Sequence, residues 1–248
     1  MHAPPAHEEH APLLVLLHGY AQDHVAIAAA LGANALADEH GFFLALPDGT
    51  LDPNGRRFWN ASDACCNFQR LPVDDVAYID AILADALARY PIDATRVYVA
   101  GFSNGGFMAH RYACERAERV AAVVSLAGDP SKDASQCKPR VPVSVLQVHG
   151  DADPVVPYEG APAYGGSVFR MPAAIPSAKE GIATWSRLDG CGAPTTSDDG
   201  REEDLRYVGC AGGTEVQLWT RHGATHALGL RHEDMERVWS FLAVHTRT

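Results

Sequence analysis

The sequence predicts an α/β fold in which a mainly parallel central sheet carries helices on both faces. A short, uninterrupted apolar run such as 13–17 is typical of a strand that is buried on both sides, and 143–148 is also expected to be a buried strand. Longer stretches place apolar residues at helical spacing, as Ile79 and Leu83 do within 73–90. Because the two kinds of segment alternate along the chain, the strands are expected to run parallel to one another.

The expected elements follow from the same two patterns, taken along the chain. Strands are predicted at 13–17, 42–46, 96–100, 120–127, 143–148, 205–208 and 216–219, and helices at 25–40, 73–90, 104–118, 177–189 and 233–244.

Two long segments, 48–72 and 151–176, show neither pattern and are predicted to be loops. The first contains Trp59, Cys65 and Cys66, which is too apolar for a disordered segment. Long loops of this kind are often functional, so we expect an ordered loop at one edge of the sheet.

Length and charge limit the classes of protein that fit. A chain of 248 residues suits one α/β domain, and we predict a flexible tail over residues 1–11 followed by a single domain over 12–248. The net charge of −11, with no cluster of Lys and Arg, argues against a nucleic-acid partner. The absence of an apolar run near about 18 residues argues against a membrane span.

The cysteines indicate an oxidising compartment. Their number is even and no Cys-x-x-Cys pair occurs, a pattern that favours disulfides over a zinc site. The segment Met1–Ala11 lacks the apolar core of a signal peptide. We therefore expect a secreted or periplasmic protein whose signal peptide has been removed. The six residues are Cys65, Cys66, Cys114, Cys137, Cys191 and Cys210.

A Gly-x-Ser-x-Gly motif centred on Ser103 lies between a predicted strand and a predicted helix. This is the context of a nucleophile elbow, in which the chain turns sharply and the serine adopts a strained backbone. Gly101 and Gly105 would remove side chains that otherwise clash across the turn. The motif predicts an α/β-hydrolase catalytic domain with Ser103 as the nucleophile.

A serine nucleophile needs a base and an acid, which follow it along the chain in this fold. Asp151 and Asp153 both follow the strand at 143–148, and His222 and His226 both follow the strand at 216–219. The pattern of residues alone leaves both pairs of alternatives open. The i,i+4 spacing of the histidines could indicate a metal, but the glycine between them and the lack of a Glu argue against it, so neither a metal nor a cofactor is expected.

The oxyanion hole of this fold takes one backbone N–H from the residue after the nucleophile and one from an early loop. Asn104 and Tyr20 occupy those two positions in the sequence. Because their amides would donate, substitution of their side chains is a poor test of the role.

With these residues in hand, the chain resembles the secreted polyhydroxybutyrate-depolymerase-like and feruloyl-esterase family of α/β-hydrolases, also called LpqC-like. The resemblance runs from about residue 12 to about residue 243. It rests on His18-Gly19-Tyr20 with Gln22, Pro47-Asp48-Gly49, Trp59-Asn60, Cys65-Cys66, Val73-Asp74-Asp75-Val76, Gly101-Phe102-Ser103-Asn104-Gly105-Gly106, His149-Gly150 and Asp153-Pro154-Val155-Val156-Pro157-Tyr158.

The resemblance implies a role for several residues. It implies Asp153 as the triad acid and His226 as the base, and it implies that Trp59 and Asn60 line the acyl or alcohol pocket. Exported members of the family carry disulfides, and Cys191 with Cys210 resembles a pair that brackets a late insertion.

The sequence departs from the family directly after the predicted base. Relatives commonly have Trp-Pro there, whereas Ala227-Leu228 follows His226 in this chain. The difference changes the expected pocket wall and bears on the substrate more than on the chemistry.

The function expected from the sequence is carboxylic ester hydrolysis through an acyl-enzyme, of the feruloyl esterase or polyhydroxybutyrate depolymerase type. The partner would be a small-molecule or polymeric ester. Two alternatives use the same scaffold: an acyltransferase, in which the same triad operates with water excluded, and a non-catalytic binding protein.

Overall fold

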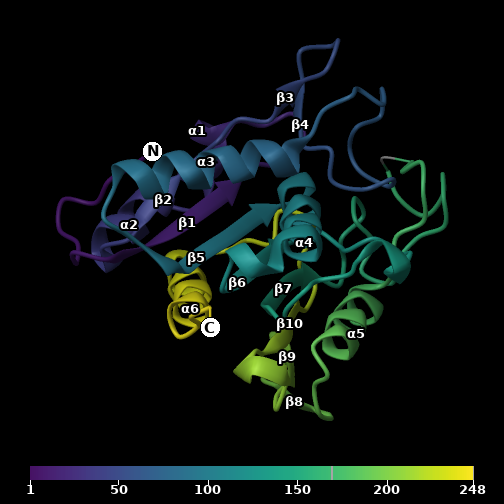
Figure 1. Cartoon of the computed structure of the whole chain (residues 1–248). Helices are drawn as coiled ribbons and strands as arrows, with labels where there is room; N and C mark the ends of the chain where they lie inside the picture. The colour runs from purple at the N-terminus through teal and green to yellow at the C-terminus, as the bar shows by residue number, and fades with distance from the viewer. Residues whose placement is uncertain (169, 248) are drawn as a thin grey trace.

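A computed structural model describes residues 1–168 and 170–247 (Figure 1). Its centre is an eight-stranded sheet with the strand order β2-β1-β5-β6-β7-β10-β9-β8. The strands of this sheet are β1 (Ala11–Leu17), β2 (Phe43–Ala45), β5 (Ile92–Phe102), β6 (Ala122–Leu126), β7 (Ser144–Gly150), β8 (Pro194–Asp198), β9 (Glu202–Tyr207) and β10 (Val216–Arg221). The helices are α1 (His24–Ala30), α2 (Ala33–His40), α3 (Asp75–Arg89), α4 (Asn104–Arg116), α5 (Ala178–Leu188) and α6 (His232–Ala243).

The prediction of a mainly parallel sheet is confirmed. The six strands from β2 to β10 in the sheet order pair in parallel, and only β9 and β8 are antiparallel to their neighbours. Parallel strands buried on both faces are mainly apolar, and β1 and β7 are buried at every position.

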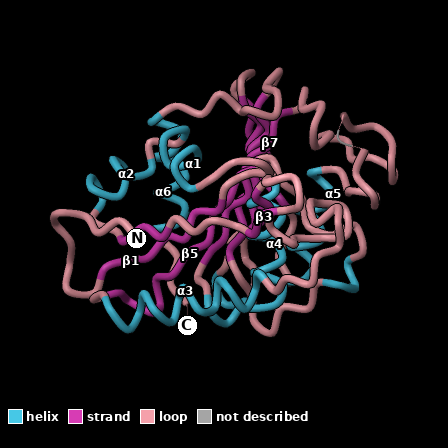
Figure 2. The backbone as a smooth tube through the Cα atoms, turned by 90° about the horizontal axis from the view of Figure 1, so that it is seen from above, coloured by secondary structure: helices cyan, strands magenta, loops and turns pink. Residues whose placement is uncertain are grey.

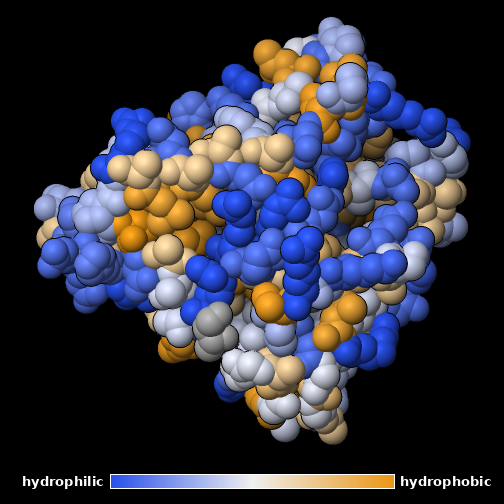
Figure 3. All heavy atoms as spheres, in the orientation of Figure 1, coloured by the Kyte–Doolittle hydropathy of each residue, from blue (hydrophilic) through white to orange (hydrophobic). Residues whose placement is uncertain are grey.

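Helices cover both faces of the sheet, as Figure 2 shows from above. On one face, α1, α2 and α6 pack through residues such as Ile27, Leu36 and Trp239. On the other face, α3, α4 and α5 pack through residues such as Ile79 and Phe107. The surface shown in Figure 3 is largely hydrophilic, with apolar side chains gathered in separate patches.

Local signals explain where several helices begin. The Asp74 side chain accepts a hydrogen bond from the Ala77 N–H at the start of α3, and Ser177 forms a capping box with Glu180 at the start of α5. These side chains satisfy N–H groups that the first turn of a helix leaves without a partner.

The structure differs from the predicted elements in three places. The single helix expected at 25–40 is two helices, because Gly32 adopts a left-handed backbone with φ of 59° between them. The loop expected at 48–72 contains a short hairpin of β3 (Thr50–Leu51) and β4 (Arg57–Phe58). The edge strand β8 was not predicted, since its sequence Pro-Thr-Thr-Ser-Asp is exposed throughout and has no apolar alternation.

The N-terminal residues contact the sheet. His2 pairs with Leu44 through two backbone hydrogen bonds of 2.8 and 3.0 Å, and Arg96 forms an ion pair with Glu8. The flexible tail over 1–11 and the single domain over 12–248 stay predictions.

All six cysteines are paired in disulfides. Cys191 bonds to Cys210, as the resemblance implied, and this bridge ties the end of α5 to the segment after β9. The other pairs are Cys65–Cys66 and Cys114–Cys137. Within the described residues, no helix combines the length and the apolar character needed to cross a bilayer.

A buried carboxyl group at the end of α5 is expected to make stability depend on pH. The Asp189 side chain is 1% exposed and accepts hydrogen bonds from the Val143 N–H and the Thr214 hydroxyl. Burial raises the pKa of Asp189 to about 6, above the value of roughly 4 in an unfolded chain. Ionisation of Asp189 therefore costs more free energy in the folded state than in the unfolded chain. Its contribution to the free energy of unfolding falls as pH rises from about 4 to about 6 and is level above that.

Asp189→Asn removes this titration. Urea unfolding at pH 4, 5, 6, 7 and 8 should show the variant gaining about 2–3 kcal/mol of unfolding free energy relative to the natural chain between pH 4 and pH 7. A difference between the two proteins that does not change with pH would contradict the assignment.

Candidate active site

Three loops that meet at one edge of the sheet carry the predicted triad. Ser103 follows β5, Asp153 follows β7 and His226 follows β10, and these strands lie close together in the order β5-β6-β7-β10 (Figure 1). In an open α/β sheet, the carboxyl ends of the strands are where ligands bind.

The turn from β5 to α4 has the strained geometry that the Gly-x-Ser-x-Gly motif predicts. Ser103 has φ of 53° and ψ of −118°, a backbone conformation that a residue with a side chain seldom adopts. A β-carbon on Gly101 would lie 2.2 Å from the Gly105 carbonyl, and one on Gly105 would lie 2.3 Å from the Leu17 carbonyl oxygen. The glycines therefore let α4 start directly against the ends of β5 and β1.

The acid loop and the base loop are held together by their backbones. The Ala152 N–H donates to the Ala224 carbonyl at 3.1 Å. A β-carbon on Gly150 would lie 2.1 Å from that same carbonyl oxygen, so a larger residue would separate the two loops. Close packing at the ends of β7 and β10 thus brings Asp153 within reach of His226.

The three side chains form a continuous hydrogen-bonded chain. The His226 Nδ1 lies 2.7 Å from an Asp153 carboxylate oxygen, and the His226 Nε2 lies 2.9 Å from the Ser103 Oγ. With Nδ1 donating to the carboxylate, Nε2 is left to accept the serine proton. The structure therefore brings together the three residues that the resemblance selected.

Asp153 is poised to remain ionised. Its side chain is fully buried, and one carboxylate oxygen accepts from the Val155 and Val156 N–H groups at 2.8 and 3.0 Å. Burial on its own would raise the pKa of Asp153, but hydrogen bonds from His149 and His226 outweigh it and hold the pKa well below its usual range.

The two alternatives left open by the sequence form a second, separate pair. Asp151 accepts from His222 Nδ1 at 2.9 Å and from the Gly223 N–H, and the other ring nitrogen of His222 lies 3.3 Å from Asp198. Both nitrogens of His222 thus face carboxylates, and no hydrogen bond joins this ring to Ser103. The pair fastens the tip of the β10 loop to its neighbours.

The early loop expected to supply an oxyanion donor is braced on both sides of Tyr20. His18 is fully buried, donates from Nδ1 to the Gly19 carbonyl and accepts the Gly49 N–H at Nε2. The Gln22 side chain accepts the Gly19 N–H at 3.0 Å. Burial lowers the pKa of His18, which keeps its ring neutral and suited to this pair of bonds.

Asn104, the second expected oxyanion residue, is the first residue of α4, where a backbone N–H has no partner within the helix. Its side chain has a role that sequence reasoning missed. The Asn104 amide accepts the Trp59 N–H at 2.7 Å and donates to the Trp59 carbonyl at 2.9 Å. The long loop is thereby fastened directly to the residue after the nucleophile.

Trp59 and Asn60 lie next to the elbow and are themselves held by the protein. The Trp59 indole is fully buried and donates to the His18 carbonyl at 2.9 Å, which makes it a brace for the oxyanion loop. The Asn60 amide donates to the Val73 carbonyl at 3.0 Å, and Asn60 borders a cavity of about 360 Å³ that Phe107 also lines. Contact of either side chain with a substrate stays a prediction.

A chain of buried polar groups lies behind the triad acid and was also missed. His149 Nε2 donates to the Val156 carbonyl at 2.8 Å and lies 3.5 Å from Asp153. Its Nδ1 accepts from Gln147 at 3.1 Å, and Gln147 also donates to Asp129 at 2.7 Å. Polar residues inside the otherwise apolar strand β7 were the signal for this network, because buried polar groups need partners.

The rim of the site carries partly exposed aromatic rings. Tyr20 packs edge-on against Phe68 with 5.4 Å between ring centroids, and Phe102 packs against His226 at 5.1 Å. Because Phe102 contacts the base, we expect an apolar acyl group at Ser103 to lie near its ring.

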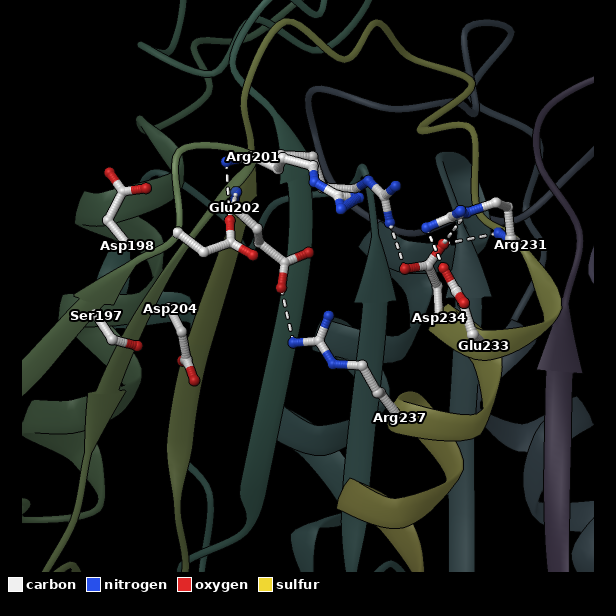
Figure 4. Close-up of a pocket in the computed structure, with 11 residues that line it drawn as sticks. Ser197, Asp198, Arg201, Glu202, Asp204, Arg231, Glu233, Asp234 and Arg237 are labelled. Carbon is white, nitrogen blue, oxygen red and sulfur yellow. Dashed lines mark hydrogen bonds and ion pairs between the residues drawn. The ribbon is translucent and has the colours of Figure 1, made fainter.

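A larger cavity of about 570 Å³ lies elsewhere, between the β9 side of the sheet and the start of α6 (Figure 4). Several of its charged side chains form ion pairs: Arg237 pairs with Glu202 at 2.7 Å and Arg221 with Asp234 at 3.0 Å. No triad residue lines this cavity, so size alone does not identify the reactive site.

The tight fit of Gly105 gives a testable consequence. Gly105→Ala should push α4 away from the end of β1, which displaces the Asn104 amide, and we expect kcat to fall by about 100-fold or more, since a shift of 1 Å can have that effect. Ester hydrolysis kinetics would measure this loss, with Gly165→Ala as the control because its β-carbon would meet only the Pro162 ring at 3.3 Å. Equal kcat in the two variants would contradict the account of the elbow.

Comparison with known proteins gives an independent view of the chain. Residues 1–178 match the family described as esterase PHB depolymerase. The chain is 32% identical over 206 residues to feruloyl esterase B of Piromyces equi, covering 82% of this chain and 36% of that protein. It is also 32% identical over 219 residues to the putative esterase NocK of Nocardia uniformis subsp. tsuyamanensis, covering 87% of this chain and 61% of that protein.

The chain thus spans between about a third and three fifths of the length of these relatives. Among solved structures, acetyl xylan esterase from Aspergillus awamori superposes with a TM-score of 0.71 at 16% identity, covering 98% of this chain and 92% of that one. At that identity the superposition supports the fold alone, and it agrees with the α/β-hydrolase architecture described above. From the match over residues 1–178 and the two relatives, the chain belongs to the esterase PHB depolymerase family.

Proposed function

We propose that this protein is a serine carboxylic ester hydrolase that works through an acyl-enzyme. The observation that carries the proposal is the unbroken chain from Ser103 Oγ through the His226 ring to the buried Asp153 carboxylate, at 2.9 and 2.7 Å. A serine hydroxyl becomes an effective nucleophile when a neighbouring base accepts its proton.

In this proposal, Ser103 attacks the ester carbonyl while His226 Nε2 takes the hydroxyl proton, and Asp153 stabilises the resulting imidazolium. The carbonyl oxygen becomes an oxyanion that accepts from the Tyr20 and Asn104 amides, each of which lowers the barrier by roughly 3 kcal/mol. The imidazolium then protonates the leaving alcohol. A water molecule then attacks the acyl-enzyme while His226 takes its proton. His226 returns this proton to the Ser103 oxygen as the carboxylic acid is released.

For the substrate, we propose a hydroxycinnamate ester or a hydroxyalkanoate oligomer. The relatives support this class, since they include proteins named feruloyl esterase B and poly(3-hydroxyalkanoate) depolymerase C, the latter from Paucimonas lemoignei at 31% identity over 140 residues. The aromatic rim formed by Tyr20, Phe68 and Phe102 suits a flat or apolar acyl group. The two residues directly after the base, Ala227 and Leu228, are not aromatic.

The test is a substrate panel of methyl ferulate, 3-hydroxybutyrate oligomers and p-nitrophenyl esters of increasing chain length. We expect hydrolysis of methyl ferulate or of the oligomers, with kcat/KM above that of the short p-nitrophenyl esters, and no turnover by Ser103→Ala. Absence of any hydrolysis by the folded protein above the Ser103→Ala blank would overturn the proposed activity.

We also propose that the protein functions in an oxidising compartment, outside the cell or in the periplasm. The three disulfides support this, because such bonds persist where thiols are not kept reduced.

A further inference from the structure

Four side chains that can bind a metal converge where the end of α2 meets the start of α6. Glu39 and His40 are the last two residues of α2, and His232 and Glu236 lie one turn apart on α6. The ligand atoms of Glu39, His232 and Glu236 all lie within 4.8 Å of one another. We propose that Glu39, His40, His232 and Glu236 form a surface site for Zn²⁺ that ties α2 to α6.

The distances among three of the four donors suit a single ion. With zinc–ligand bonds near 2.0–2.1 Å, neighbouring ligand atoms of a tetrahedral site lie about 3.3–3.4 Å apart. The His232 Nε2 lies 3.3 Å from Glu39 and 3.5 Å from Glu236. The His40 Nε2 lies 2.9 Å from Glu236 on the opposite helix, next to these three donors, and we infer that it supplies the fourth ligand.

The arrangement differs from an ordinary histidine ion pair. Both carboxylates of the proposed site face the same nitrogen of His232. In the His222 cluster, by contrast, Asp151 faces Nδ1 and Asp198 faces Nε2, on opposite sides of the ring. The His222 cluster cannot direct its three donors at one ion, whereas the proposed site can, so the two clusters form a natural comparison within one chain.

The chemistry of the four donors favours zinc over the other common divalent ions. Two imidazoles and two carboxylates suit Zn²⁺, while Mg²⁺ and Ca²⁺ prefer all-oxygen sites. The side chains are open to solvent, with exposures of 59% for His232 and 49% for Glu39, so an ion can enter without rearrangement. The net charge of −11 favours cation binding in general.

One ligand of the site is held in place by packing. The His40 ring lies 5.6 Å from the buried Trp239 indole, which itself stacks on Phe42 at 4.1 Å. A copper ion bound at His40 would therefore sit beside a fluorescent side chain, and Cu²⁺ binds most nitrogen and oxygen sites more tightly than Zn²⁺ does. Quenching of Trp239 fluorescence should therefore accompany copper binding at this site.

Metal binding should compete with protons, because a ring nitrogen must lose its proton before it can bind the ion. We expect the affinity for Zn²⁺ to fall as pH is lowered from 8 to 5.5. Metal bound to the folded state should also raise the unfolding temperature, because the ion would crosslink two helices that separate on unfolding.

The experiment compares the natural chain with Glu236→Gln, His232→Ala and the matched control His222→Ala; His232 and His222 are exposed and Glu236 is half-buried. Titration calorimetry with ZnCl₂ at pH 7.5 should give one site in the natural chain and in His222→Ala. Both should gain about 2–4 °C or more in unfolding temperature with saturating zinc, the shift expected for a modest gain in stability at this chain length. Glu236→Gln and His232→Ala should lose at least tenfold in affinity and most of that shift.

The second measurement is quenching of tryptophan fluorescence by CuCl₂. It should be strong in the natural chain and in His222→Ala, and weak in Glu236→Gln and His232→Ala. No zinc binding by the natural chain, or equal binding and quenching in His232→Ala and the natural chain, would overturn the proposal. Loss of zinc binding in His222→Ala but not in His232→Ala would place the ion at the His222 cluster and would also overturn the proposal.

Discussion

Replacing Ser103 with alanine is expected to lower kcat for ester hydrolysis by about 10⁴-fold or more, the size of loss found when a triad nucleophile is removed. The hydroxyl is the attacking atom in the proposed reaction, and no other side chain of the triad can take its place. The residual rate would come from the oxyanion amides and from substrate binding.

The same substitution should leave the fold intact. The Ser103 side chain is partly exposed and its hydroxyl bonds to His226, so alanine leaves no buried polar group of the core without a partner. Thermal unfolding of the variant is the control, with a midpoint within about 2 °C of the natural chain. A folded Ser103→Ala protein that retains more than a tenth of the activity would show that another residue attacks the ester.

Asp153→Asn is expected to lower kcat by roughly 10⁴-fold, because an amide can donate to the His226 ring and favour the tautomer that cannot accept the serine proton. The matched control is Asp151→Asn, two residues away in the same loop, whose carboxylate pairs with His222 instead. We expect this control to retain kcat within about threefold, since surface substitutions away from the reacting groups have small effects.

Steady-state kinetics of the two asparagine variants on one ester would decide between the two aspartates. The reverse order, with Asp151→Asn inactive and Asp153→Asn active, would exclude the proposed acid. Equal losses would indicate that the loop as a whole, rather than one carboxylate, supports the reaction.

The sequence was sufficient for the fold class because the signals for parallel strands are strong. Apolar runs such as that of β1 have few structural alternatives, and the strand-to-helix position of Ser103 gave the motif a context that Gly-x-Ser-x-Gly alone lacks. The family resemblance read from the motifs is confirmed by the match over residues 1–178.

The choice among acid and base candidates could not be made from residue types. The chain contains two Asp–His pairs with nearly the same spacing, Asp151–His222 at 71 residues and Asp153–His226 at 73, and both pairs form in the folded protein. What separates them is which ring reaches Ser103, and that depends on how the loops after β7 and β10 pack.

Other features could not be predicted because the local sequence carries little signal for them. The polar edge strand β8 pairs with β9 through its backbone, so its side chains carry no apolar alternation. The hydrogen bonds from Asn104 to Trp59 join residues 45 positions apart, and sequence reasoning considered only the backbone of Asn104. Such long-range polar contacts depend on the packed structure rather than on local propensity.

The proposed reaction requires that His226 activates the Ser103 hydroxyl. Labelling with a fluorophosphonate, followed by mass spectrometry of the peptides, measures this activation. We expect one adduct per chain, located on Ser103. This adduct should be absent in Ser103→Ala and should form far more slowly in His226→Ala. An adduct on any other residue, or labelling of Ser103 at an unchanged rate in His226→Ala, would contradict it.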